Sequence, residues 1–253
     1  MSAIIKQYTF GGLTYRVETP IPMREEARFE AFSSEAGAEP DYCLYVKPFR
    51  LDQVPDSTWP VIMERSGHGI TVYMNTALLP EITVANLFVS ARIANLLPER
   101  NEFLLHASYI VHEGKAILFS APSGTGKSTQ ARFWERVRGS TVVNEDRVLI
   151  FKQNNTYMAG GAWATGSARL TANVSVPIRA IVLLGQAPEN RVIPCKPSQA
   201  LGRLLIQCSY DETNRESVDR MLTLLIDLLS HVPVLAYDCV NDPSAVKDLE
   251  DFL

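Results

Sequence analysis

The stretch Ala121-Pro122-Ser123-Gly124-Thr125-Gly126-Lys127-Ser128 decides how this sequence is interpreted. An apolar run, residues 115–120, precedes it, and a helix-compatible run, residues 129–137, follows it. A glycine-rich loop between a strand and a helix, ending in Lys-Ser, is typical of a P-loop, whose backbone holds the phosphates of a nucleotide. The sequence therefore predicts a β-strand, a phosphate-binding loop and an α-helix, in that order.

The residue types in this loop suit that chemistry. Gly124 and Gly126 allow the backbone to turn successive N–H groups toward one point, where a side chain would obstruct a phosphate. The start of the following helix adds unpaired N–H groups and the positive end of its dipole. We expect Lys127 to reach the outer phosphates of ATP and Ser128 to ligate Mg²⁺. The predicted nucleotide-binding residues are Ser123, Gly124, Thr125, Gly126, Lys127, Ser128 and Thr129.

The loop departs from the strict pattern at its first position. Ala121 stands there in place of glycine, and Pro122 follows it. Alanine takes positive φ values less freely than glycine, but this position comes before the tight part of the loop. We therefore expect the alanine to be tolerated.

An acidic pair follows the predicted helix, which should end at Gly139 as its C-cap. The next segment, Thr141–Val148, is an apolar strand that runs directly into Glu145 and Asp146. The short gap from the loop favours a phosphotransferase over a P-loop hydrolase. Adjacent side chains on a strand point to opposite sides, so one acid can organise Mg²⁺ while the other faces an incoming hydroxyl. The alternative interpretation is a solvated strand end.

Three segments carry a family resemblance, namely Leu105-His106-Ala107-Ser108, residues 118–129 and residues 143–147. Together they resemble the catalytic domain of HPr kinase/phosphorylase and its shorter kinase relatives, and the similarity covers most of residues 100–253. The resemblance implies ATP, Mg²⁺ and phosphorylation of a hydroxyl, usually that of serine. It also implies a fold shared with phosphoenolpyruvate carboxykinase. Because the later signature for HPr and phosphorolysis is not visible, HPr itself is not the expected substrate.

Roles can be assigned to the candidate residues from these patterns. His106 could hydrogen-bond the acidic pair and tune its protonation, although a core or capping histidine is the other interpretation. Glu145 stands where HPr kinases have the first of two aspartates, whereas Asp146 matches, so we assign Asp146 to the acceptor and Glu145 mainly to the metal. The predicted catalytic residues are Lys127, Asp146, Glu145 and His106, and the predicted metal ligands are Ser128, Glu145 and Asp146.

Three regions are expected along the chain. Residues 1–80 contain short apolar runs separated by Gly, Pro and Asp clusters, which indicates a small strand-rich region. Residues 81–99 have apolar side chains at helical spacing and predict a bridging helix. Residues 100–253 are predicted to form the kinase domain. The expected fold class is α/β (α+β), with a P-loop kinase core like that of HPr kinase and phosphoenolpyruvate carboxykinase.

Composition limits the partners. The 253 residues carry a net charge of −4, which gives no cationic field for a nucleic-acid backbone. No long uncharged apolar stretch predicts a membrane span, so we expect a cytoplasmic protein without a membrane partner. The 4 cysteines lack the paired spacing of zinc sites, and we expect reduced thiols. Whether the chain forms a homo-oligomer is left open.

The sequence thus predicts an ATP-dependent kinase that phosphorylates a hydroxyl on a peptide, a protein or a small molecule. A nucleotide-binding switch or sensor with slow ATP hydrolysis is the main alternative, because it would share the phosphate loop. A carboxykinase-type enzyme is the weakest alternative, since no further His, Lys and Asp constellation is placed for a second metal. The identity of the acceptor cannot be read from the sequence.

Overall fold

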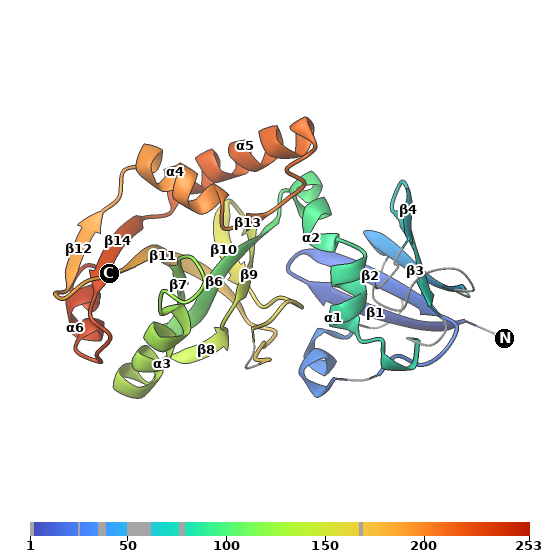
Figure 1. The fold of residues 1–253 in the computed structure, drawn as a ribbon, viewed down its shortest axis with the longest axis horizontal. Helices are drawn as coiled ribbons and strands as arrows, with labels where there is room; N and C mark the ends of the chain where they lie inside the picture. The colour runs from blue at the N-terminus through green and yellow to red at the C-terminus, as the bar shows by residue number, and fades with distance from the viewer. Residues whose placement is uncertain (1–2, 25, 35–38, 50–61, 76–78, 167–168) are drawn as a thin grey trace. The chain divides into compact units, whose positions relative to one another are not determined.

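The structure is a computed structural model that describes residues 3–24, 26–34, 39–49, 62–75, 79–166 and 169–253. The chain has a mixed α/β fold with two β-sheets. It divides into two compact units, Met1–Ile93 and Ala94–Leu253, and each contains one of the sheets (Figure 1).

The first unit is built on a five-stranded sheet with the order β1-β2-β3-β5-β4. Its elements are β1 (Ile4–Phe10), β2 (Leu13–Thr19), η1 (Ala27–Phe32), β3 (Tyr42–Phe49), β4 (Ile62–Ser66), β5 (Gly69–Asn75), η2 (Leu79–Glu81) and α1 (Val84–Ser90). Buried positions alternate along β2 and β5, as expected when one face of a sheet is covered. The core is aromatic: Phe10 stacks on Phe32 at 4.5 Å between ring centroids, and Phe88 of α1 lies 4.9 Å from Tyr15.

The helix predicted over residues 81–99 is broken into shorter pieces. Besides η2 and α1, this part of the chain contains α2 (Ile93–Leu96) and η3 (Leu97–Arg100). Arg92 has a φ of 47°, which is incompatible with a continuous right-handed helix. The helical spacing of the apolar residues in this segment therefore reflects burial of one side of the chain and not a continuous helix. Leu87, Ile93 and Leu97 are all buried.

The second unit is built on a nine-stranded sheet whose main path is β10-β9-β6-β7-β11-β14-β12, with β8 and β13 both paired to β6. The strands are β6 (Phe103–His112), β7 (Lys115–Ser120), β8 (Thr141–Asn144), β9 (Arg147–Gln153), β10 (Thr156–Gly160), β11 (Ser175–Gln186), β12 (Arg191–Pro194), β13 (Cys208–Ser209) and β14 (Val234–Cys239). In its centre β7, β11 and β14 run parallel. Their carboxyl ends therefore meet at one edge, where α/β sheets commonly bind ligands.

Helices cover both faces of this sheet (Figure 1). They are α3 (Lys127–Arg138), α4 (Pro197–Leu205), α5 (Arg215–His231) and α6 (Ala245–Glu250). Side chains of β7 alternate between the faces: Leu118 packs in the core with α4 and α5, and Phe119 packs in the core with α3 and α6. Among the described residues, no helix is both long and apolar enough to cross a membrane.

Candidate functional site

The loop singled out in the sequence connects β7 to α3, at the carboxyl end of the parallel strands. Gly124 has a φ of 80° and Gly126 a φ of 110°, a region that L-residues rarely adopt. Gly126 is also the N-cap of α3. A Cβ added at either glycine would meet no atom within 4 Å, so the space in front of the loop is open. The glycines are therefore required by the backbone conformation, and the space beside them stays open at the start of α3.

The first position of the loop tolerates alanine, as expected. Ala121 is 4% exposed and packs in the core beneath α3. It is not among the residues with positive φ. The glycine of the strict pattern is therefore not required for the conformation that the loop adopts here, and the methyl group adds apolar contact instead.

Lys127, the first residue of α3, folds back over the loop. Its Nζ donates hydrogen bonds to the carbonyl oxygens of Ala121, at 2.9 Å, and of Pro122, at 3.2 Å. Burial lowers the pKa of the Lys127 ammonium group, while the nearby carboxylate of Asp146 acts in the opposite direction. Among the described residues, the hydrogen-bond partners of the amine are thus two carbonyl oxygens of the loop. An ammonium group has three donors, so a phosphate oxygen can be added to this set.

The acidic pair lies in a bend between β8 and β9, which corrects the expectation that both acids sit on one strand. Asn144 makes this bend. Its buried Oδ1 accepts hydrogen bonds from the backbone N–H groups of Asp146, at 2.9 Å, and Arg147, at 3.1 Å. Its Nδ2 donates to the carbonyl oxygen of Ala164. The direction of the two acids is therefore fixed by an Asx-type turn and not by strand alternation.

Asp146 lies beside His106. The distance from His106 Nε2 to Asp146 Oδ1 is 3.3 Å, and the other ring nitrogen, Nδ1, lies 2.9 Å from Gln207 Oε1. The backbone N–H of His106 also donates to the carbonyl oxygen of Gln207. The hydrogen bond from His106 lowers the pKa of the Asp146 carboxyl, with further contributions from the positive charges of Arg147 and Lys127. Asp146 is therefore ionised at neutral pH, as a charge-stabilising or proton-accepting group must be.

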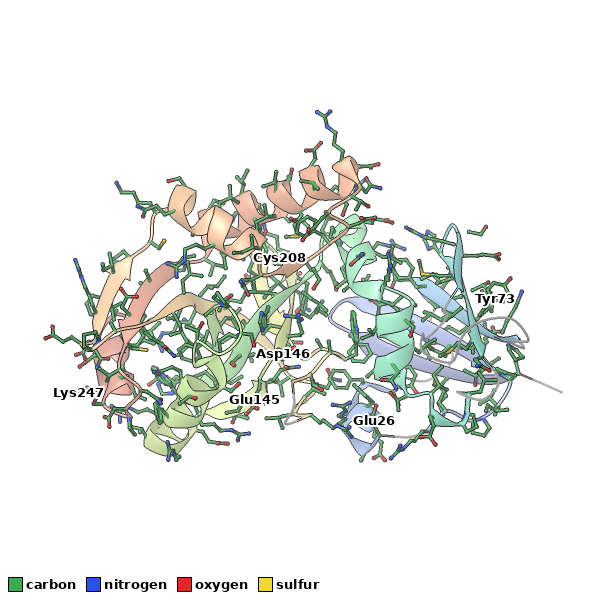
Figure 2. All side chains as sticks on the ribbon, viewed as in Figure 1. Glu26, Tyr73, Glu145, Asp146, Cys208 and Lys247 are labelled. Carbon is green, nitrogen blue, oxygen red and sulfur yellow. The ribbon has the colours of Figure 1, made fainter. Side chains whose placement is uncertain are left out.

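Glu145, labelled beside Asp146 in Figure 2, contacts α3. Its carboxylate pairs with the guanidinium of Arg132, and its side chain is 10% exposed, compared with 33% for Asp146. Its carbonyl oxygen accepts a hydrogen bond from Ser108 and lies 3.5 Å from Ser128 Oγ. The two acids thus have different environments: one is held by a cation on α3, and the other faces His106.

These groups share one cavity of about 380 Å³. It is lined by His106, Ser123, Gly124, Gly126, Lys127, Ser128, Thr129, Glu145, Asp146 and Gly166. Of the residues predicted from the sequence, Thr125 alone is absent from this lining; its hydroxyl donates to the carbonyl oxygen of Pro122. The loop and the acids, 17 or more residues apart in the chain, are thus brought together.

Sequence reasoning missed several residues that shape the cavity. Gly166 approaches Asp146 so closely that a Cβ there would lie 3.3 Å from the Asp146 Cβ. Gln207 orients His106, and Arg132 holds Glu145. The spacing of Arg132, one helical turn beyond Ser128, was an available signal, because residues four apart lie on one face of a helix. No comparable signal marks Gln207.

Comparison with known proteins gives a family. The family profile described as SynChlorMet cassette protein ScmC matches residues 81–218, more than half of the sequence. The chain belongs to the ScmC family. No curated protein matches it significantly. Among solved structures, the HPr(Ser) kinase/phosphatase from Coxiella burnetii is 12% identical to this ScmC-family chain and has a TM-score of 0.32. That comparison covers 59% of this chain and 91% of the Coxiella chain, and it is too distant to assign an activity.

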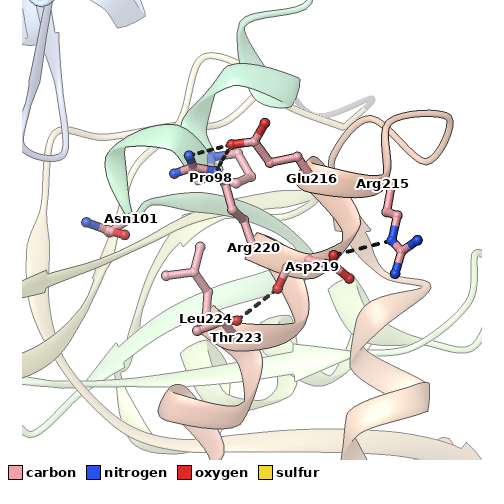
Figure 3. Close-up of a pocket in the computed structure, with 8 residues that line it drawn as sticks. All are labelled: Pro98, Asn101, Arg215, Glu216, Asp219, Arg220, Thr223 and Leu224. Atoms are coloured by element: carbon pink, nitrogen blue, oxygen red, sulfur yellow. Dashed lines mark hydrogen bonds and ion pairs between the residues drawn. The ribbon is translucent and has the colours of Figure 1, made fainter.

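The ScmC-family chain has a larger cavity, of about 680 Å³, between η3 and the first half of α5 (Figure 3). Its charged side chains pair with neighbours one turn away on α5: Arg220 with Glu216 at 2.7 Å, and Arg215 with Asp219 at 3.8 Å. Such pairs on an exposed helix surface are ordinary and weakly stabilising. This cavity brings no reactive groups together, so the smaller one is the candidate site despite its size.

In the described part of the ScmC-family chain, no group of three or more His, Cys, Asp and Glu residues is arranged to hold a metal ion. The oxygen donors of the smaller cavity, from Ser128, Glu145 and Asp146, are instead placed beside the loop. This arrangement suits a cation that the protein contacts through one or two carboxylates and that completes its coordination with phosphate oxygens and water.

Proposed function

We propose that this protein is an ATP-dependent kinase that phosphorylates a hydroxyl group on a peptide, a protein or a small molecule. The observation that carries the proposal is the cavity itself. It combines a glycine loop and a buried lysine on one side with an ionised carboxylate, Asp146, held by His106 on the other. Phosphoryl transfer depends on positioning and on charge stabilisation more than on covalent chemistry, and these are the groups it uses.

The donor groups of the cavity fit a polyphosphate. The first N–H groups of an α-helix have no carbonyl partner within it, and no atom occupies the space beside Gly124 and Gly126, next to the start of α3. Lys127 adds a positive charge at the same loop. The anionic part of ATP is thus matched by backbone dipoles and one cation, and Ser128 supplies the hard oxygen that Mg²⁺ prefers.

Asp146 is the residue proposed to face the acceptor. Its side chain is the more exposed of the two acids, and the pKa of its carboxyl is lowered, so it is negatively charged when the acceptor arrives. In the transfer, Asp146 orients the hydroxyl and takes its proton as the new O–P bond forms and the bond to the departing ADP breaks. A carboxylate of low pKa suffices because the proton leaves late in a loose transition state.

Glu145 and Ser128 are proposed to support the metal. The Ser128 hydroxyl lies 3.5 Å from the backbone carbonyl oxygen of Glu145, and both residues line the cavity, which supports this assignment. Arg132 pairs with Glu145 and so holds the carboxylate of Glu145 in place between α3 and the bend. Bound Mg-ATP would supply the transferable γ-phosphoryl group and the divalent charge that offsets it.

A transfer assay tests the proposal directly. The protein is incubated with Mg²⁺ and γ-labelled ATP in the presence of small hydroxyl compounds, serine-containing peptides and the products of neighbouring genes. Label on an acceptor supports a kinase, and the Lys127→Ala variant is the control for contaminating kinases. Slow release of phosphate with no labelled acceptor would favour the nucleotide switch instead. Absence of ATP binding would reject both functions.

A further inference from the structure

The candidate site of about 380 Å³ is called the first cavity below. A second cavity next to the glycine loop, of about 130 Å³, lies on the other flank of that loop. It shares Gly124, Gly126 and Thr129 with the first cavity, so the loop forms a wall between the two. Its remaining lining comes from Thr125, Gln130, Gln186, Cys239, Val240 and Asn241. Gln186 ends β11, and Cys239 ends β14, so the cavity stands at the carboxyl ends of two parallel strands.

Gln130 is an unusual member of this lining. It is 3% exposed, and its Nε2 donates a hydrogen bond to Cys239 Sγ at 3.3 Å. Its Oε1 is buried and has no hydrogen-bond partner among the residues that the structure describes. Leaving a buried acceptor unsatisfied is costly, and such atoms in folded proteins call for an explanation. In a cavity beside a phosphate-binding loop, a bound ligand that donates a hydrogen bond provides one.

We propose that this second cavity binds the base of the nucleotide, and that Gln130 Oε1 accepts a hydrogen bond from the 6-amino group of adenine. The inference rests on the proposed function, because it needs the phosphates to occupy the first cavity. A nucleotide would then lie across Gly124 and Gly126, with its charged end on Lys127 and its base on Gln130. The volume corresponds to roughly four waters, which suits part of one heteroaromatic ring system and excludes a second polyphosphate.

The orientation of the Gln130 amide selects between purines. Because Nε2 is engaged by Cys239 Sγ, the free end of the amide is an acceptor. Adenine carries an amino group, a donor, where guanine carries a carbonyl oxygen, an acceptor. Guanine would therefore leave two acceptors facing each other in a buried place. The site is thus expected to prefer ATP to GTP.

The wall between the cavities is fixed by a second glutamine. Gln186 Nε2 donates to the carbonyl oxygen of Thr125 at 3.3 Å, which ties the tip of the loop to the end of β11. The base and the phosphates would thus bind to opposite sides of one braced segment. Substitutions at Gln130 are accordingly expected to weaken binding of the base and to leave binding of the phosphates unchanged.

The test compares ATP, GTP and inorganic tripolyphosphate, each with Mg²⁺, by calorimetry on the wild-type chain and on Gln130→Leu. We expect the wild type to bind ATP more tightly than GTP. In Gln130→Leu, ATP affinity should fall about 2- to 10-fold, the loss of one neutral hydrogen bond, and tripolyphosphate affinity should not change. The melting temperature of the ligand-free variant should be equal or higher, since an unsatisfied acceptor is removed. Gln153→Leu, at the exposed end of β9, is the matched control.

Other outcomes overturn the inference. Equal affinity of the wild type for ATP and GTP would refute the proposed role of Gln130. An equal loss of affinity for ATP and for tripolyphosphate in Gln130→Leu would refute it as well. If Gln130→Leu does not fold, Asn241→Ala provides the test at an exposed position of the same cavity. It should weaken the binding of ATP without weakening the binding of tripolyphosphate. If the wild type binds tripolyphosphate but shows no preference between ATP and GTP, only the proposed base site is rejected. Binding of none of the three would reject the proposed function as well.

Discussion

Replacing Asp146 with asparagine is expected to separate the proposed catalysis from folding at the candidate site. Asparagine keeps the shape of the side chain and an oxygen that can face His106 Nε2, 3.3 Å away in the wild type. It exchanges a charge-assisted contact for a neutral one, at a cost of about 1 kcal/mol or less for a side chain that is one-third exposed to solvent. Loss of the proton acceptor should instead slow transfer by about 100- to 10,000-fold, or roughly 2.7 to 5.4 kcal/mol in the barrier.

The neighbouring substitution, Glu145→Gln, is the matched comparison. It also changes a carboxylate to an amide, but in the side chain that pairs with Arg132. We expect it to weaken Mg²⁺-dependent nucleotide binding, with activity partly restored at higher Mg²⁺, because mass action offsets a weakened metal ligand. Arg132→Ala removes the same ion pair while leaving the carboxylate, and it therefore controls for the loss of the pair itself.

Two measurements decide between the roles: the rate of transfer in a single turnover, and the affinity for ATP as Mg²⁺ is varied. Asp146→Asn should bind ATP as tightly as the wild type but transfer the phosphoryl group much more slowly. If Asp146→Asn transfers phosphate normally while Glu145→Gln is inactive at every Mg²⁺ concentration, the two roles are reversed. If both variants remain active, the bend carries solvated acids without a catalytic function, and both assigned roles are wrong.

The remaining predictions concern the loop and acid stability. Lys127→Ala should lower the transfer rate by about 100- to 1,000-fold with little change in folding, and near-normal turnover by the folded variant would reject the placement of the phosphates. Mg-ATP at about 100 times its dissociation constant should add roughly 2.7 kcal/mol to the free energy of unfolding, measured as a rise in melting temperature; no shift over a wide concentration range would contradict nucleotide binding. Because the folded-state pKa of Asp146 lies below its ordinary value of 3.8, its stabilising contribution is present above about pH 4 and is lost as the pH falls through the folded-state pKa. Asp146→Asn should therefore lose less stability than the wild type on acidification below pH 4 in urea titrations, and parallel losses would refute this.

The features that sequence predicted best are those set by neighbouring residues. The strand, the loop and the helix around Gly124 and Gly126 follow one another without interruption, so each is specified locally. Gly139 was predicted as the C-cap of that helix, and its φ of 64° confirms this. The tolerance of Ala121 was also predictable, because the demand for positive φ falls on the two later glycines.

The features that sequence predicted poorly depend on backbone geometry at single residues. The apolar spacing before η3 correctly indicated a buried side, but nothing in it marks Arg92 as the residue where the helix breaks. Likewise, adjacency of Glu145 and Asp146 on an apparent strand suggested opposite directions from strand alternation. The directions do differ, but the cause is the buried amide of Asn144, which turns the chain out of the strand.

The two glutamines that complete the site show why sequence reasoning stops where it does. Gln207 meets His106 across 101 residues, and Gln130 meets Cys239 across 109, so both contacts exist only once the sheet has assembled. The pairing of β13 with β6 brings Gln207 to the ring, and the ends of β11 and β14 close around Gln130. Glutamine has no charge and no fixed spacing that would mark it in advance. Its effect comes from which end of the amide faces a neighbour: Gln207 Oε1 lies beside Nδ1 of His106, and Gln130 Oε1 requires a donor from whatever occupies its cavity. The loop would thus supply affinity for any polyphosphate, whereas the two neutral amides would orient the His106 ring at one end of the site and set base preference at the other.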